Sequence, residues 1–287
     1  MKSVISERAD LFFEKENGAY LEVLCPLPPI SGITPRRAVL ILPGGGYHHL
    51  CPREGAPIAR RFYAEGYGTF VLHYSVLCST DTLVDEKSGL PKPILEGMAA
   101  LAYIRRHAER YNIDPEKITV VGFSAGGHLA ASLATVWENE QYRTAAGVTA
   151  QEVKPNAAVL SYSVGYIEDG WQRQSSFSRL FDGFSDTDSA AKALSPAFQV
   201  SRNTCPCFLW HNADDDVVSV KHALLTASAL SEKHVPFELH IYPHGGHGVS
   251  SAFPDALKTP PSAATAHVSA WMEEAFAWLD FCVFPEP

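Results

Sequence analysis

Residues 120–128 read Val-Val-Gly-Phe-Ser-Ala-Gly-Gly-His, so Ser124 lies between Gly122 and Gly126 where an apolar run ends and a run of small residues begins. In a G-x-S-x-G turn the serine is held in a strained backbone conformation, and side chains at the glycine positions would collide with neighbouring backbone. The turn exposes the hydroxyl, and the following helix directs its amino-terminal N–H groups toward any oxyanion formed there. The stretch therefore predicts a strand, a sharp turn carrying a nucleophile, and a helix.

The flanks of this motif favour that interpretation. Residues 117–121 are rich in β-branched side chains and predict a short strand. Leucine and alanine residues from Leu129 to Ala134 predict a helix whose small face can pack closely on a sheet. The alternative is a glycine-rich loop that contains a serine by chance.

Strands and helices alternate along the rest of the chain. Apolar runs predict further strands at 20–24, 37–42, 69–74, 157–160, 207–210 and 237–242. Helical periodicity predicts helices around Ile58 and Phe62, from Ile94 to Ala102, over roughly 220–233, and from Val268 to Leu279. Such alternation builds βαβ units with helices on both faces of a mostly parallel sheet. We expect one three-layer α/β domain spanning 1–287.

The segment 161–206 is too long for a plain connection between a strand and the next element. It mixes glycines and polar residues with large apolar side chains, namely Trp171, Phe177, Leu180, Phe181 and Phe184. We expect this segment to be a small inserted cap or lid.

An activated serine needs a base and a group that orients the base, and candidates for both follow predicted strands. A carboxylate-rich loop, His211 to Val218, comes directly after the strand at 207–210. The strand at 237–242 is followed by Pro243-His244-Gly245-Gly246-His247-Gly248. The carboxyl ends of strands are where α/β sheets place their sites. The chain order is Ser, Asp, His, and it predicts Ser124, Asp215 and His247 as nucleophile, orienting acid and base.

Neighbouring residues offer alternatives at two of these positions. Asp214 and Asp216 compete with Asp215, and Asp216 or Ser219 could instead cap the helix that begins near residue 220. His247 is preferred to His244 because glycines flank it on both sides. The histidines at 240, 244 and 247 could also form a metal cluster, but no carboxylate or cysteine lies at a familiar ligand spacing. We expect neither a metal nor a cofactor.

Three consecutive glycines, Gly44 to Gly46, follow the strand at 37–42 and precede Tyr47. They can present unobstructed backbone N–H groups to a tetrahedral oxyanion. A phosphate-binding loop is the alternative, but neither the Lys-Ser/Thr pair of the P-loop nor a G-x-G-x-x-G pattern is present.

The chain resembles the α/β-hydrolase superfamily over roughly residues 20–283, and within it the acetyl xylan esterase-like and hormone-sensitive-lipase-like carboxylesterases. The resemblance rests on Pro43-Gly44-Gly45-Gly46-Tyr47, Pro52-Arg53-Glu54, the motif at 122–128, Leu194-Ser195-Pro196 and the loop at 211–218. It implies oxyanion donors at Gly45, Gly46 and Ala125. Proline at position 43 replaces the histidine of the familiar His-Gly-Gly-Gly form, which favours the branch that acts on small sugar esters over lipases.

The resemblance implies a serine carboxylesterase that removes short acyl groups from a carbohydrate or small alcohol through an acyl-enzyme, and we expect the acyl group to be acetyl. Tyr47 and Glu54, just after the glycines, are candidate substrate-binding residues, with structural packing as the alternative. A peptidase or lipase on the same scaffold, or a catalytically silent binding protein, remains a rival. The natural substrate and the oligomeric state stay open.

The amino-acid composition argues against several other classes of function. The 287 residues are 46% hydrophobic and 19% charged, with a formal net charge of −9, which argues against binding to nucleic acid or to an anionic membrane. The first 17 residues are highly charged, and the chain has no apolar stretch long enough for a signal peptide or membrane span. The six cysteines are scattered, which favours free thiols. We expect a cytoplasmic protein with a small-molecule ester substrate.

Overall fold

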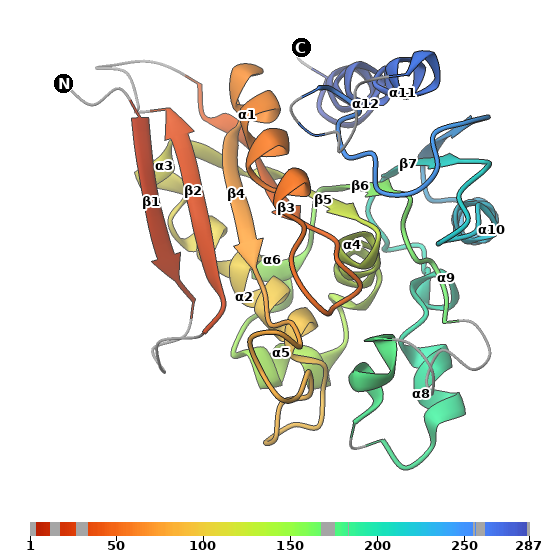
Figure 1. Ribbon diagram of the computed structural model, residues 1–287. Coiled ribbons are helices and arrows are strands. Elements are labelled where there is room, and N and C mark those ends of the chain that lie inside the picture. The colour runs from red at the N-terminus through yellow and green to blue at the C-terminus, as the bar shows by residue number, and fades with distance from the viewer. Residues whose placement is uncertain are drawn as a thin grey trace.

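A computed structural model describes residues 4–11, 18–26, 34–167, 176–182, 184–254, 256 and 262–285. An eight-stranded sheet lies at its centre in the order β1-β2-β4-β3-β5-β6-β7-β8 (Figure 1). The strands are β1 (Val4–Asp10), β2 (Tyr20–Pro26), β3 (Arg36–Leu42), β4 (Gly68–His73), β5 (Ile113–Phe123), β6 (Ala157–Ser161), β7 (Cys207–Asn212) and β8 (Phe237–Tyr242). Only the β1–β2 and β2–β4 pairings are antiparallel, so the predicted mostly parallel sheet is confirmed.

Helices connect the strands. The described helices are α1 (Ala56–Ala64), α2 (Lys92–Arg106), α3 (Ala108–Tyr111), α4 (Ala125–Val136), α5 (Glu140–Ala146), α6 (Ala150–Val153), α8 (Thr187–Ala193), α9 (Pro196–Gln199), α10 (Lys221–Glu232), α11 (Ala263–Val268) and α12 (Trp271–Trp278). Short 3-10 turns are η1 (Pro52–Glu54) and η2 (Ser176–Phe181), and η3 (Leu279–Val283) is a π-helical turn.

The core has two layers because side chains alternate across the sheet. Along β3, Ala38, Leu40 and Leu42 face the layer that contains α2 and α4, whereas Val39 and Ile41 face the layer that contains α1 and α12. A strand buried on both faces reads as a continuous apolar run, which is the pattern at 38–42. Helices therefore cover both faces, as Figure 1 shows, and the three-layer expectation is confirmed.

The sequence analysis did not predict the short helices α3, α5, α6, α8 and α9, and two further differences concern an edge strand and the last helix. The strand β1 was not predicted, because Glu7, Arg8 and Asp10 are charged. A strand is predicted from apolar residues that alternate with polar ones, and these charges obscure that pattern. It pairs with β2 at the edge of the sheet, where such residues can stay exposed. The single helix expected from 268 to 279 is divided into α11 and α12, with Ser269 and Ala270 between them.

The segment between β6 and β7 carries η2, α8 and α9. Figure 1 shows it projecting from the end of the sheet toward which β4 points, and α9 packs on α4 and α10. Phe177, Leu180 and Phe181 are buried. Trp171 lies outside the described residues. The role of 161–206 as a lid stays a prediction.

Candidate active site

Ser124 occupies the turn between β5, which ends at Phe123, and α4, which begins at Ala125. Its φ of 53° and ψ of −118° are strained for a residue with a side chain. The backbone N–H of Ser124 donates to the carbonyl of Ser161 at 3.0 Å, which ties the turn to the end of β6. The turn predicted from G-x-S-x-G is therefore present in the structure.

Close backbone approaches explain the glycines of the turn. A Cβ at Gly126 would lie 2.0 Å from the carbonyl oxygen of Leu42 and 2.4 Å from that of Pro43. A Cβ at Gly122 would lie 2.2 Å from the carbonyl oxygen of Gly126. The first turn of α4 thus packs directly on the end of β3, where the glycine loop at 44–46 begins.

The structure brings together Ser124, His247 and Asp215, which come from three loops. The Ser124 Oγ lies 2.9 Å from Nε2 of His247, and Nδ1 of His247 lies 2.7 Å from Oδ2 of Asp215. The Asp215 side chain is fully buried, and that of His247 is 16% exposed. This is the geometry of a nucleophile, a base and an orienting acid. The assignment of these roles stays a prediction.

The surroundings of Asp215 hold it as a carboxylate. Its Oδ1 accepts the backbone N–H groups of Val217 and Val218, each at 2.9 Å. His211 Nε2 donates to the Val218 carbonyl at 2.8 Å and lies 3.3 Å from Asp215 Oδ2. Burial alone raises the pKa of Asp215, but hydrogen bonds from His211 and His247 outweigh it and hold the pKa well below its ordinary value.

The competing residues have other partners. Asp214 Oδ1 accepts the N–H groups of Gly245 and Gly246, each at 2.9 Å, so it orders the loop that carries His247. His244 is 71% exposed and lies 3.3 Å from Asp214. His240 contacts Glu238 and Glu274. Among the described residues, no group of three or more His, Cys, Asp or Glu side chains is placed to hold a metal ion.

The glycine loop turns sharply beside Ser124. Positive φ values occur at Gly45 (124°) and Gly46 (65°), and the N–H of His48 closes the turn on the Gly45 carbonyl at 3.0 Å. In the part of the chain that the structure describes, the N–H groups of Gly45 and Gly46 donate no hydrogen bond. Ala125 begins α4, so its N–H has no acceptor in a preceding helical turn. These three amides are thus available to a ligand; their role as oxyanion donors stays a prediction.

The two candidate substrate-binding residues, Tyr47 and Glu54, both have buried side chains. Tyr47 has no exposed surface, and its hydroxyl lies 2.8 Å from Nδ1 of His128. Glu54 is 2% exposed and accepts the N–H of Gly44 at 2.7 Å. Both side chains make their contacts inside the protein, next to the glycine loop. Their role in substrate binding stays a prediction.

Several residues around the site were not singled out from the sequence. Tyr162 follows β6 and packs edge-on against the imidazole of His247, with ring centroids 5.0 Å apart. His211 supports Asp215 from the end of β7. His128 links Tyr47 to the carbonyl of Leu194, which accepts from Nε2 at 2.7 Å. The sequence places Tyr162 and His211 at the carboxyl end of a strand and His128 in the first turn of α4. His128 and His211 also lie in stretches that carry the family resemblance.

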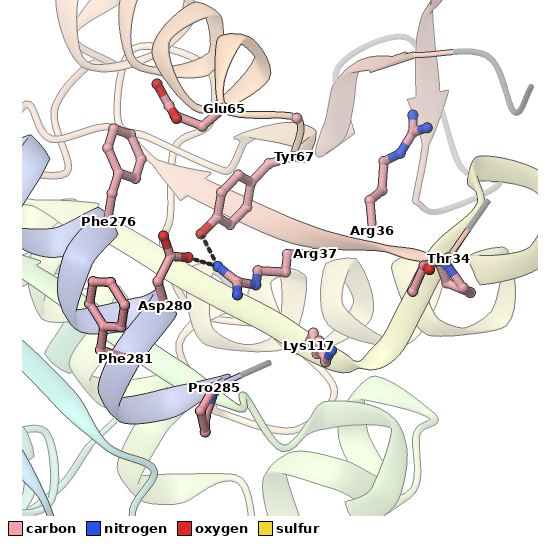
Figure 2. Close-up of a pocket in the computed structure, with 12 residues that line it drawn as sticks. Thr34, Arg36, Arg37, Glu65, Tyr67, Lys117, Phe276, Asp280, Phe281 and Pro285 are labelled. Atoms are coloured by element: carbon pink, nitrogen blue, oxygen red, sulfur yellow. Dashed lines mark hydrogen bonds and ion pairs between the residues drawn. The ribbon is translucent and has the colours of Figure 1, made fainter. Parts of the chain in front are cut away.

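A separate cavity of about 610 Å³ lies near the amino-terminal end of β3, the opposite end of that strand from the glycine loop. Figure 2 shows that the Arg37 guanidinium points at Tyr67 and Asp280. Arg37 also donates to the carbonyl of Phe284 at 3.1 Å. Its guanidinium therefore fastens the carboxyl-terminal segment to the sheet.

None of the helices in the described ranges is long and apolar enough to cross a membrane. All six cysteines are free thiols in the structure.

Comparisons with known proteins identify a family and several relatives of this chain. The sequence matches the BD-FAE family over residues 27–230. It is 36% identical over 223 residues to the endo-1,4-beta-xylanase B of Butyrivibrio fibrisolvens and 26% identical over 216 residues to the acetylxylan esterase of Xylanibacter ruminicola. These matches cover 76% and 74% of this chain, but the chain spans only 33% and 41% of the length of those relatives.

A solved structure matches over nearly the full length of both chains. The acetyl ester-xyloside bifunctional hydrolase of Caldicellulosiruptor lactoaceticus is 29% identical, with a TM-score of 0.72, and the match covers 94% of this chain and 97% of that chain. The expected α/β-hydrolase fold is confirmed.

Proposed function

The chain belongs to the BD-FAE family, and from this membership and the geometry of the site we propose that it is a serine carboxylesterase acting on short-chain acyl esters. The observation that carries the proposal is the chain of contacts from Ser124 Oγ to His247 Nε2 at 2.9 Å and from His247 Nδ1 to Asp215 at 2.7 Å. Free backbone amides beside the hydroxyl complete the parts that acyl transfer requires.

In this mechanism His247 Nε2 accepts the proton of the Ser124 hydroxyl as Oγ attacks the ester carbonyl. The carbonyl oxygen becomes an oxyanion, which the N–H groups of Ala125, Gly45 and Gly46 stabilise. The tetrahedral intermediate then expels the alcohol, to which His247 returns the proton. Water then attacks the acyl-enzyme through the same steps, with His247 as the base, and releases the acid and the free Ser124 hydroxyl. Asp215 orients the imidazole and stabilises its positive charge while it holds the proton.

Acetyl groups on carbohydrates are the substrate class that we propose. Two relatives are named for acetyl ester hydrolysis, an acetylxylan esterase and an acetyl ester-xyloside hydrolase. Pro43 in place of the histidine of the lipase-like form agrees with a small ester substrate. A net charge of −9 also suits a neutral sugar ester better than an anionic substrate.

The test is hydrolysis of p-nitrophenyl acetate by wild type and by Ser124→Ala. We expect kcat to fall by about 10⁴-fold or more, because the nucleophile is absent. Ser132→Ala is a matched control, since this buried serine on the same helix donates only to the carbonyl of His128, at 2.8 Å. Equal turnover by wild type and Ser124→Ala would refute the assignment of the nucleophile.

Acyl-chain length separates the esterase proposal from its rivals. Acetylated xylo-oligosaccharides and p-nitrophenyl esters from acetate to octanoate would be compared with a p-nitroanilide amide. We expect the highest kcat/KM on acetyl esters and no measurable turnover of the amide. A maximum of kcat/KM at octanoate would indicate a lipase, and turnover of the amide would indicate a peptidase. Failure of a fluorophosphonate to label the protein would indicate a catalytically silent protein.

A further inference from the structure

Glu54 is a buried carboxylate that touches the glycine loop but lies outside the proposed triad. It ends the short turn η1, which begins six residues after Gly46, and is 2% exposed. Its Oε2 accepts the backbone N–H of Gly44 at 2.7 Å, and its Oε1 accepts the hydroxyl of Tyr162 at 2.7 Å. Both oxygens thus accept, which is the pattern of an ionised carboxylate, because a protonated one would need an acceptor for its own O–H.

Tyr162 carries this contact to the loop that holds His247. Its hydroxyl accepts the backbone N–H of Ser250 at 3.0 Å, three residues after His247. Its ring packs against the imidazole with centroids 5.0 Å apart. The indole of Trp210 also packs edge-on against the Tyr162 ring, with centroids 5.0 Å apart. The Tyr162 side chain is therefore fixed between Glu54 and the histidine loop.

Arg53, the residue before Glu54, makes a second connection to the same loop. Its guanidinium donates to the carbonyls of Gly248 and Ala256, each at 2.9 Å. Its own carbonyl accepts the Ser250 hydroxyl at 2.6 Å. One helical turn therefore contacts both the glycine loop and the segment after His247.

We propose that Glu54 is a positioning residue, which holds the glycine loop through Gly44 and the histidine loop through Tyr162 in the relative placement that acyl transfer needs. This inference rests on the proposed esterase function. Gly44 lies against the nucleophile, since a Cβ on it would come 3.0 Å from Cβ of Ser124. Loss of Glu54 would release Gly45, Gly46 and His247 together, so its effect falls on the reaction more than on binding.

The charge of Glu54 adds an electrostatic role. Burial raises the pKa of its carboxyl above the ordinary value, and hydrogen bonds from Tyr162 and Gly44 and the charge of His247 offset only part of that rise. The charge of Glu54 thus interacts with that of His247. Asp215 is the other acid that faces His247. The titratable groups facing Glu54 are His247, Arg53, Cys51, Tyr74 and Tyr162.

The test compares Glu54→Gln and Tyr162→Phe with wild type on p-nitrophenyl acetate. Glutamine keeps the shape, but its amide has only one acceptor oxygen for two donors, so one of the two contacts is lost. We expect kcat to fall by about 10- to 100-fold with KM changed by less than about threefold. We also expect the acidic limb of the kcat/KM profile to move to lower pH in Glu54→Gln, because the buried negative charge is gone.

Glu96→Gln is the matched control. Glu96 is likewise buried and accepts a backbone N–H and a hydroxyl, both from Ser75, but it touches neither loop of the site. We expect this variant to lose thermal stability to a similar degree as Glu54→Gln while keeping the wild-type kcat and pH profile. A purely structural role for Glu54 would make the two variants behave alike.

The outcomes separate this inference from the proposed function. Wild type without Ser124-dependent turnover would refute the proposed function and the inference with it. Ser124-dependent turnover in wild type, with folded Glu54→Gln and Tyr162→Phe that both match Glu96→Gln in kcat and pH profile, would refute the inference alone. Should Glu54→Gln not fold, Tyr162→Phe decides: a lowered kcat supports the inference, and a wild-type kcat overturns it.

Discussion

Gly126→Ala tests whether close packing of the nucleophile turn on β3 sets the geometry of the site. The added Cβ would lie 2.0 Å from the Leu42 carbonyl oxygen and 2.4 Å from that of Pro43. Favourable carbon–oxygen contacts are about 3.3–3.6 Å. Helix α4 and the end of β3 would therefore have to separate by about 1.3 Å. That separation falls between Ser124 and the glycine loop.

Two effects follow from this displacement. Overpacking costs about 1–3 kcal/mol of unfolding free energy, which exceeds the gain of up to about 1 kcal/mol that alanine brings to a helix. A 1 Å misplacement at a reacting centre costs about 10²-fold in rate. We therefore expect the variant to melt a few degrees below wild type and kcat on p-nitrophenyl acetate to fall by about 10²-fold.

The assay pairs thermal unfolding with steady-state kinetics, and Gly97→Ala is the control. The three atoms nearest to a Cβ at Gly97 on α2 all belong to the side chain of Leu133, the nearest at 2.8 Å, and a rotamer change can move that side chain. We expect this control to keep the wild-type kcat. A Gly126→Ala enzyme that retains kcat within about threefold and melts no lower than wild type would refute the reasoning.

Two further predictions concern stability. Burial lowers the pKa of His128 to about 4, so the unfolded chain binds a proton that the folded chain does not between pH 4 and about 6.5. The free energy of unfolding should then keep its full value above pH 6.5 and fall by up to about 1.4 kcal/mol per pH unit below it. In urea titrations, His128→Gln should show a shallower fall than wild type, whereas the exposed His267→Gln should not. Arg37→Met should cost about 1–2 kcal/mol, because Asp280 and the Phe284 carbonyl lose their donor, and should leave kcat unchanged. A melting temperature equal to that of wild type, or of the exposed Arg202→Met, would contradict this account of the carboxyl-terminal segment.

Local patterns in the sequence determined most of the sheet. Strands such as β3 and β5 are buried on both faces, so their apolar runs are visible without knowledge of their neighbours. The edge strand β1 was not predicted because its charged residues pair with residues far along the chain. One example is Glu7, which contacts the guanidinium of Arg110. A pairing of that kind has no local signal.

Part of the candidate site could likewise be predicted from local sequence, and part could not. Steric demands on the backbone are local, so the glycines around Ser124 marked the nucleophile turn, and chain order pointed to Asp215 and His247. The sequence could not separate Asp214 from Asp215 on physical grounds, because adjacent loop residues differ only in where their side chains point. In the structure Asp215 meets the imidazole, and Asp214 binds the backbone of the same loop.

Burial is the property that only the tertiary structure decided. In the sequence, Tyr47 and Glu54 look like ordinary polar residues beside a ligand site. In the structure, the Tyr47 hydroxyl hydrogen-bonds to His128 inside the protein. Glu54 accepts hydrogen bonds from Gly44 and Tyr162, also inside the protein. A carboxylate tolerates such a position only where donors from separate segments converge on it. That convergence depends on contacts between residues 108 positions apart, and these exist only once the sheet has assembled.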